Sequence, residues 1–115
     1  MAAIAPTVDT PAAGITRVTW AGVTNSDTCQ PFMVRGATGI SGNLQMTGTP
    51  GSATATLGGR NDESSSFVNI PDLSDDAISL TAAGAKDFST AMLWLAPQLS
   101  GGGGTQDLDF VMVLR

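Results

Sequence analysis

Short stretches in which apolar and polar residues alternate follow one another along most of this chain. The alternation has a period of two, which places the apolar side chains of a β-strand on one face. In residues 107–115 it puts Leu108, Phe110, Met112 and Leu114 on one face. Glycine, proline, asparagine, aspartate and serine divide the stretches at intervals of about ten residues, a spacing typical of an antiparallel sandwich or barrel.

We therefore predict an all-β fold, an antiparallel β-sandwich of about eight strands with a jelly-roll-like or Greek-key arrangement. The expected strands are residues 15–21, 31–36, 40–48, 52–59, 66–70, 77–81, 88–97 and 107–115. The run 88–97 is the most apolar, and we expect its Leu93–Trp94–Leu95 segment to be covered on both faces. A single helical turn fits only residues 81–88, where Gly84 interrupts it.

The first fourteen residues differ from the rest of the chain. Residues 1–14 are rich in alanine, proline and threonine and show no sustained period. We interpret them as an extended N-terminal arm, poorly ordered in isolation, ahead of one β-sandwich domain that covers residues 15–115.

Four consecutive glycines, Gly101–Gly104, precede the final apolar stretch. A phosphate-binding loop would need a lysine after its glycines, and a dinucleotide site would need a helix. Here Thr105 and Gln106 follow, and then a strand pattern. Strand-like sequence on both sides also argues against a flexible linker. We predict a hairpin loop that joins residues 88–98 to residues 107–115, in which glycine supplies positive φ angles.

The composition of the chain argues against nucleic acid and membranes as partners. The 115 residues carry a net charge of −5, with five scattered basic residues. Direct contact with nucleic acid needs clustered lysine and arginine, so we do not expect it. Only 13% of residues are charged, so much of the surface must be neutral and polar. The first residues carry no basic region, so we do not expect them to act as a secretory signal. No apolar run approaches the roughly 20 residues of a membrane span. We expect synthesis in a cytoplasm and no membrane contact.

Catalytic groups are scarce. The chain has no histidine, so a serine or cysteine nucleophile would lack its usual base. We interpret the single cysteine, Cys29, as a small buried apolar residue. Trp20 and Trp94 lie in strand-like runs and are expected in the core rather than in a sugar-binding cleft. We expect neither an enzyme nor a cofactor.

Two acidic groups are candidates for a hard cation, which takes several oxygen ligands. They are PDLSDDA, which contains Asp72, Asp75 and Asp76, and NDES, which begins at Asn61. Neither has the spacing of an EF-hand. Turn formation explains both groups, and a structural calcium ion is the alternative. We expect no metal site.

Several turn-rich segments occur in an order that resembles the head decoration, or capsid cement, proteins of tailed bacteriophages. The matching segments are WAGVTNSDTCQP (20–31), GTPGSAT (48–54), GGRND (58–62), LTAAG (80–84), APQLSGGGGT (96–105) and the closing Leu114–Arg115. Together they extend over about residues 18–115. Three positions depart from the family pattern: Ala96 stands where arginine is expected, Gly103 where aspartate is expected, and Arg60 where serine is expected.

The resemblance implies a non-enzymatic protein that binds the lattice of the major capsid protein and stabilises the head, commonly as a homotrimer. Its expected location is the outer capsid surface of the virion, after synthesis in the cytoplasm of the bacterial host. Ile4, Pro6, Val8 and Pro11 are the expected capsid or subunit contacts of the arm. The alternatives are a tail, baseplate or connector subunit, and a carbohydrate-binding sandwich module, which would need an exposed tryptophan.

Overall fold

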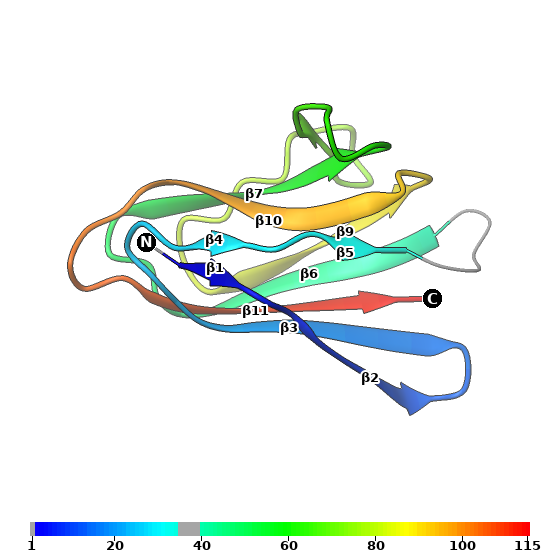
Figure 1. Cartoon of the computed structure of the whole chain (residues 1–115), viewed down its shortest axis with the longest axis horizontal. Coiled ribbons are helices and arrows are strands. Elements are labelled where there is room, and N and C mark those ends of the chain that lie inside the picture. Colours follow the sequence, from blue (N-terminus) through cyan, green and yellow to red (C-terminus); the bar gives the residue numbers. More distant parts are fainter. Residues whose placement is uncertain (1, 35–39) are drawn as a thin grey trace.

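The computed structural model describes residues 2–34 and 40–115, and within these ranges it contains strands and connecting segments but no helix. Eleven strands follow in chain order, as drawn in Figure 1. They are β1 (Ala3–Ile4), β2 (Thr7–Ala12), β3 (Ile15–Thr24), β4 (Thr28–Cys29), β5 (Phe32–Met33), β6 (Ile40–Thr49), β7 (Ala53–Arg60), β8 (Val68–Asn69), β9 (Gly84–Thr90), β10 (Trp94–Gly101) and β11 (Asp107–Leu114). The prediction of an all-β fold is confirmed.

Two sheets account for most of the strands. One has five strands in the order β2–β3–β11–β6–β9, and the other has four in the order β5–β10–β7–β8. All neighbours within these two sheets pair antiparallel, as predicted. The sheets form two layers, with β7 and β10 in the upper layer of Figure 1 and β3, β6 and β11 in the lower one. A third, two-stranded sheet pairs β1 with β4 in parallel.

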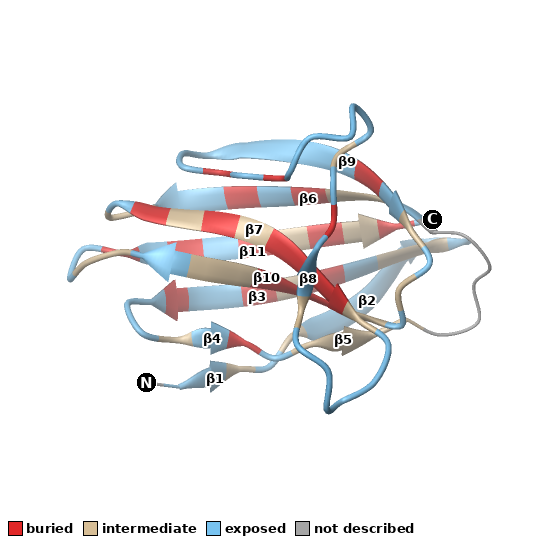
Figure 2. Cartoon of the chain, turned by 90° about the horizontal axis from the view of Figure 1, so that it is seen from above, coloured by how far each residue is buried: buried red, intermediate tan, exposed pale blue. Residues whose placement is uncertain are grey.

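One cluster of buried side chains fills the space between the two layers, and Figure 2 shows the alternation of buried and exposed positions along the strands. From the five-stranded sheet it includes Val18, Trp20, Leu44, Met46, Phe88, Leu108, Phe110, Met112 and Leu114; from the four-stranded sheet it includes Ala53, Ala55, Leu57 and Leu95. The period-two pattern of residues 107–115 therefore identified the inward face of β11 correctly.

Register explains why these residues meet. Phe110 of β11 pairs with Trp20 on one side and with Met46 on the other. Residues paired across antiparallel strands project to the same face, so the three large side chains form one row across the centre of the sheet. All three are fully buried.

The most apolar run of the sequence is not one strand, and the prediction for residues 88–97 is wrong. It divides at residues 91–93 into the end of β9, in the five-stranded sheet, and the start of β10, in the four-stranded sheet. Leu93 is 38% exposed and Trp94 is partly exposed, so this segment is not covered on both faces.

Other predicted elements shift in detail. The helical turn considered for residues 81–88 is wrong, because β9 begins at Gly84. The strand expected over 66–70 shortens to β8, and residues 77–81 contribute only isolated bridges, one of them between Ala55 and Leu80. The end of the strand expected over 31–36 lies outside the described residues.

The glycine run does not form a hairpin, and that prediction is also wrong. β10 pairs with β5 and β7, whereas β11 pairs with β3 and β6. The loop after Gly101 therefore crosses from one layer to the other, as seen at the left of Figure 1. Two of its glycines do have positive φ, 70° at Gly101 and 94° at Gly102.

The segment interpreted as an N-terminal arm is extended, and it is hydrogen-bonded to the rest of the molecule. β2 pairs antiparallel with β3 and forms an edge of the five-stranded sheet. β1 pairs with β4, with Ala3 opposite Thr28. All six residues of β2 are exposed.

Candidate functional site

The four residues predicted to contact a capsid or a subunit lie along one edge of the molecule. Ile4 packs against the core, and Pro6 is partly buried. Val8 is 50% exposed, and Pro11 is exposed. The four residues therefore fall into two groups: Ile4 and Pro6 already have contacts within the chain, whereas Val8 and Pro11 are exposed.

Asp27 holds the start of the chain in place. Its carboxylate accepts hydrogen bonds from the Thr24 hydroxyl (2.7 Å) and from the backbone N–H groups of Thr24 and Ala2 (3.0 Å each). The hydrogen bonds from Thr24 are the largest cause that lowers the pKa of Asp27 below its ordinary value. The carboxylate thus anchors β1 beside β4. Sequence reasoning missed this role, since one aspartate in a turn has no distinctive pattern.

Cys29 is buried, as predicted. Burial is the main cause that raises the pKa of its thiol to about 12, with a smaller contribution from the charge of Asp27. The thiolate is the nucleophilic form, so at neutral pH this cysteine behaves as an inert apolar residue.

The acidic loops are organised as turns. Asp62 accepts hydrogen bonds from the hydroxyl and backbone N–H groups of Ser64 and Ser65, which lower its pKa. Asp72 similarly accepts from the backbone N–H groups of Ser74 and Asp76. Within residues 2–34 and 40–115, no three acidic or cysteine side chains lie close enough together to hold a metal ion.

The outward face of the four-stranded sheet carries a different kind of cluster. Trp94 pairs with Met33 on β5 and with Arg60 on β7, so these three side chains share a face,. That face points outward, because the neighbouring Leu95 belongs to the core. The Arg60 guanidinium carbon lies 4.4 Å from the centre of the Phe67 ring, which extends the row. We call Met33, Trp94, Arg60 and Phe67 the aromatic row.

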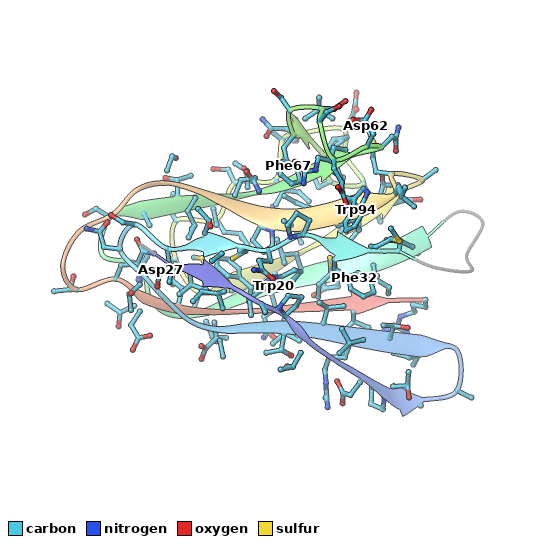
Figure 3. The ribbon with its side chains drawn as sticks, viewed as in Figure 1. Trp20, Asp27, Phe32, Asp62, Phe67 and Trp94 are labelled. Atoms are coloured by element: carbon cyan, nitrogen blue, oxygen red, sulfur yellow. The ribbon has the colours of Figure 1, made fainter. Side chains whose placement is uncertain are left out.

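All four side chains of the aromatic row are partly exposed. Figure 3 shows Phe67 and Trp94 near one another beside β7 and β10, and Trp20 lower in the molecule. Gly58 lies under part of the row: a Cβ there would meet Phe67 and Gln98 at 3.1 and 2.8 Å. The absence of a side chain at this position lets the Phe67 ring lie close to the sheet.

The outward face of the five-stranded sheet carries polar side chains that bind one another, beside the partly exposed Val111 and Val113. Arg17 donates from Nε to Asp9 at 3.0 Å, with a second contact from its Nη2, and Asn43 donates to Asp87 at 2.8 Å. Both pairs belong to one row of residues across the sheet, with Val113 between them. The charged groups of this row therefore have partners within the sheet.

No family model matches the chain, and no curated protein or solved structure matches it either. In the part of the chain that is described, no helix has the length and apolar character needed to cross a membrane.

The aromatic row is the feature that sequence reasoning did not find. Met33, Arg60, Phe67 and Trp94 are far apart in the sequence, and only the pairing of β5, β10 and β7 brings them together. Trp20 meets its prediction as a core residue, but Trp94 does not, because it lies on the outward face. A strand pattern alone cannot say which of two apolar faces meets the core.

Proposed function

We propose that this protein is a non-enzymatic capsid decoration, or cement, protein that binds the assembled major capsid lattice of a tailed bacteriophage and stabilises the head. The observation that carries the proposal is the ordered series of turn motifs from Trp20 to Arg115. The scarcity of reactive groups agrees with it: Cys29 is buried, and the acidic loops serve as turns.

We also infer that the two sheets form a jelly-roll sandwich. To compare the two sheets with a jelly roll, we number the strands from β3, which becomes strand one, and count β4 and β5 together as strand two, so that β11 becomes strand eight. In this numbering the five-stranded sheet, after its edge strand β2, has the order one, eight, three, six. The four-stranded sheet then has the order two, seven, four, five. This is the strand order of a jelly roll, an architecture found in viral capsid and lectin domains. Fold alone does not assign function, so this order supports the proposal without deciding it.

A homotrimer on the capsid surface is part of the proposal. Closed symmetry would multiply weak contacts into firm attachment. Of the four expected contact residues, Val8 and Pro11 on the edge strand β2 are exposed and accessible to a neighbour. The neutral polar surface, with 13% charged residues, suits a protein whose neighbours cover much of it.

The direct test mixes purified protein with capsids that lack it and examines them by cryo-electron microscopy. We expect ordered additional density on the outer shell. Capsids that remain bare would overturn the proposal. Immunogold labelling of intact particles separates this function from that of a tail, baseplate or connector subunit, since label on the tail would support that alternative.

A carbohydrate-binding module is the second candidate, because Trp94 is partly exposed. It is the weaker one. Trp20 is fully buried, and the Arg60 guanidinium already stacks on the Phe67 ring, so the aromatic surface left for a sugar is small.

A further inference from the structure

The two outward faces of the molecule differ in the kind of contact they can make. Protein interfaces are enriched in aromatic residues, methionine and arginine, and depleted of lysine, aspartate, glutamate, serine and alanine. The aromatic row consists of four side chains of the enriched types, all partly exposed. On the opposite face, Arg17 and Asp9 bind each other and Asn43 binds Asp87. The aromatic row is therefore the surface better suited to bind a protein.

Arg60 is the residue that gives this surface its chemical specificity. Among the described residues, its buried Nε has no hydrogen-bond partner and its guanidinium makes no salt bridge. The guanidinium is held over Phe67 instead. A cation partly removed from water in this way gains from a carboxylate, which an arginine can bind through two parallel hydrogen bonds.

The order of the row favours a protein over a sugar. A sugar ring needs an open aromatic face on which to stack. Arg60 lies between Trp94 and Phe67, and its guanidinium covers the Phe67 ring at 4.4 Å. The two rings therefore do not form a continuous platform. Tryptophan and arginine side chains near the centre of a contact are instead typical of a protein–protein hot spot.

We propose that the aromatic row is the docking surface for a partner protein that presents a carboxylate to Arg60 and apolar side chains to Trp94 and Met33. This inference rests on the proposed function, in which the partner is the major capsid subunit. It orients the molecule on the particle: the four-stranded sheet faces the shell, and the five-stranded sheet faces away from it.

The test compares two variants that each remove one cation. Arg60→Met keeps an unbranched apolar side chain over Phe67 and removes the charge. Arg17→Gln removes an exposed cation from the opposite face and serves as the matched control. Circular dichroism and thermal unfolding establish that both fold, and cosedimentation with capsids that lack the protein measures their affinity. We expect Arg60→Met to lose about tenfold or more in affinity, and Arg17→Gln to bind like the wild type.

The outcomes distinguish a failure of the docking surface from a failure of the proposed function. If the wild type binds and Arg60→Met binds equally well, the docking surface is wrong and the proposed function stands. If the wild type does not bind capsids, both fail. A cryo-electron microscopy map of wild-type particles gives a second, variant-free readout, and a five-stranded sheet facing the shell overturns the inference.

Two further measurements identify a different occupant of the same surface. If sedimentation shows that Arg60→Met abolishes self-association, the row is an interface between copies of this chain. If the wild type binds an immobilised oligosaccharide and Arg60→Met does not, the row is a glycan site. Either result overturns the proposed partner.

Discussion

Gln106 is the buried polar residue around which the glycine loop closes. Gln106 is only 3% exposed, and its side-chain Nε2 donates a hydrogen bond to the backbone carbonyl of Val23 at 3.3 Å. Its own N–H donates to the carbonyl of Gly103 at 3.0 Å, which closes a turn. A buried amide needs such partners, because an unsatisfied one destabilises the folded state. The loop and β3 are thereby joined at this end of the molecule.

Gly102 is the glycine on which this arrangement depends. A Cβ at this position would collide with Oε1 of Gln106, and its φ of 94° is strained for any other residue. We expect Gly102→Ala to lower the free energy of unfolding by about 1–3 kcal/mol, measured by chemical denaturation.

Gly104 in the same run is the matched control. A Cβ there meets nothing within 4 Å, so Gly104→Ala should change stability by no more than about 0.5 kcal/mol. Equal effects of the two substitutions would contradict the role assigned to Gly102.

Asp27 should make the attachment of β1 depend on pH. Its folded-state pKa lies below the ordinary 3.8, so its stabilising contribution is present above about pH 4 and is lost as the pH falls through the lowered folded-state pKa. The local readout is hydrogen exchange of the Thr28 N–H, which donates to the carbonyl of Ala2 at 2.8 Å. We expect its protection to decrease on acidification in this range.

Asp27→Asn is the control for this pH dependence. The asparagine oxygen can still accept a hydrogen bond, but it does not titrate between pH 2 and 5. Protection of the Thr28 N–H should then depend much less on pH. A variant that keeps the full pH dependence would show that another group controls the attachment of β1.

Among the elements, β1 and β2 contribute little to the core. β2 contributes no buried residue, and β1 contributes only Ile4, which packs against the core without being part of it. Deletion of residues 1–12 should therefore leave a cooperatively folding all-β protein with a lower melting temperature. Circular dichroism during heating measures both properties. Loss of cooperative unfolding would show that these strands are essential to the sheet.

Strand prediction succeeded where the pattern itself carries the information. In β3, β6 and β11 large apolar residues recur at every second position, as Leu108, Phe110, Met112 and Leu114 do in β11, so the alternation identifies the buried face. It failed at residues 91–93, where an apolar run continues through a change of sheet. There the backbone N–H groups of Met92 and Leu93 donate to side-chain oxygens of Thr90 and Asn61 instead of to a neighbouring strand. Asn61 is distant in sequence, so no local pattern reveals this contact.

At the scale of the whole molecule, one tryptophan lies in the core between the sheets and the other lies on the outward face of the four-stranded sheet. Trp20 is fully buried between the sheets, and its Nε1 donates to the carbonyl of Gln30 at 2.8 Å. Trp94 is partly exposed. Acrylamide should therefore quench only part of the fluorescence of the wild type, and Trp94→Phe should leave emission that is strongly protected. Efficient quenching of that variant would contradict the burial of Trp20.

The arrangement of strands into sheets is the part of the fold that the sequence conceals most. Local alternation can assign a face to a strand, but the partner of a strand depends on residues far along the chain. The glycine run shows the difficulty, since its residues suit a hairpin and a crossing between layers equally well. The aromatic row could not be predicted from the sequence for the same reason, because Met33, Trp94 and Arg60 meet only through the pairing of three distant strands.

The central places of β10 and β11 also have a consequence for how the protein is made. β11 lies between β3 and β6, and β10 lies between β5 and β7. Neither sheet can be completed before residues 94–114 have left the ribosome. Until then β2 and β3, β6 and β9, and β7 and β8 can form separate pairs with open edges, and β5 lacks its partner β10. Contacts between residues so distant in sequence slow folding to milliseconds or seconds, and open edges invite association between nascent chains. Rapid release from the ribosome, or a chaperone that shields these edges, should therefore increase the yield of folded protein.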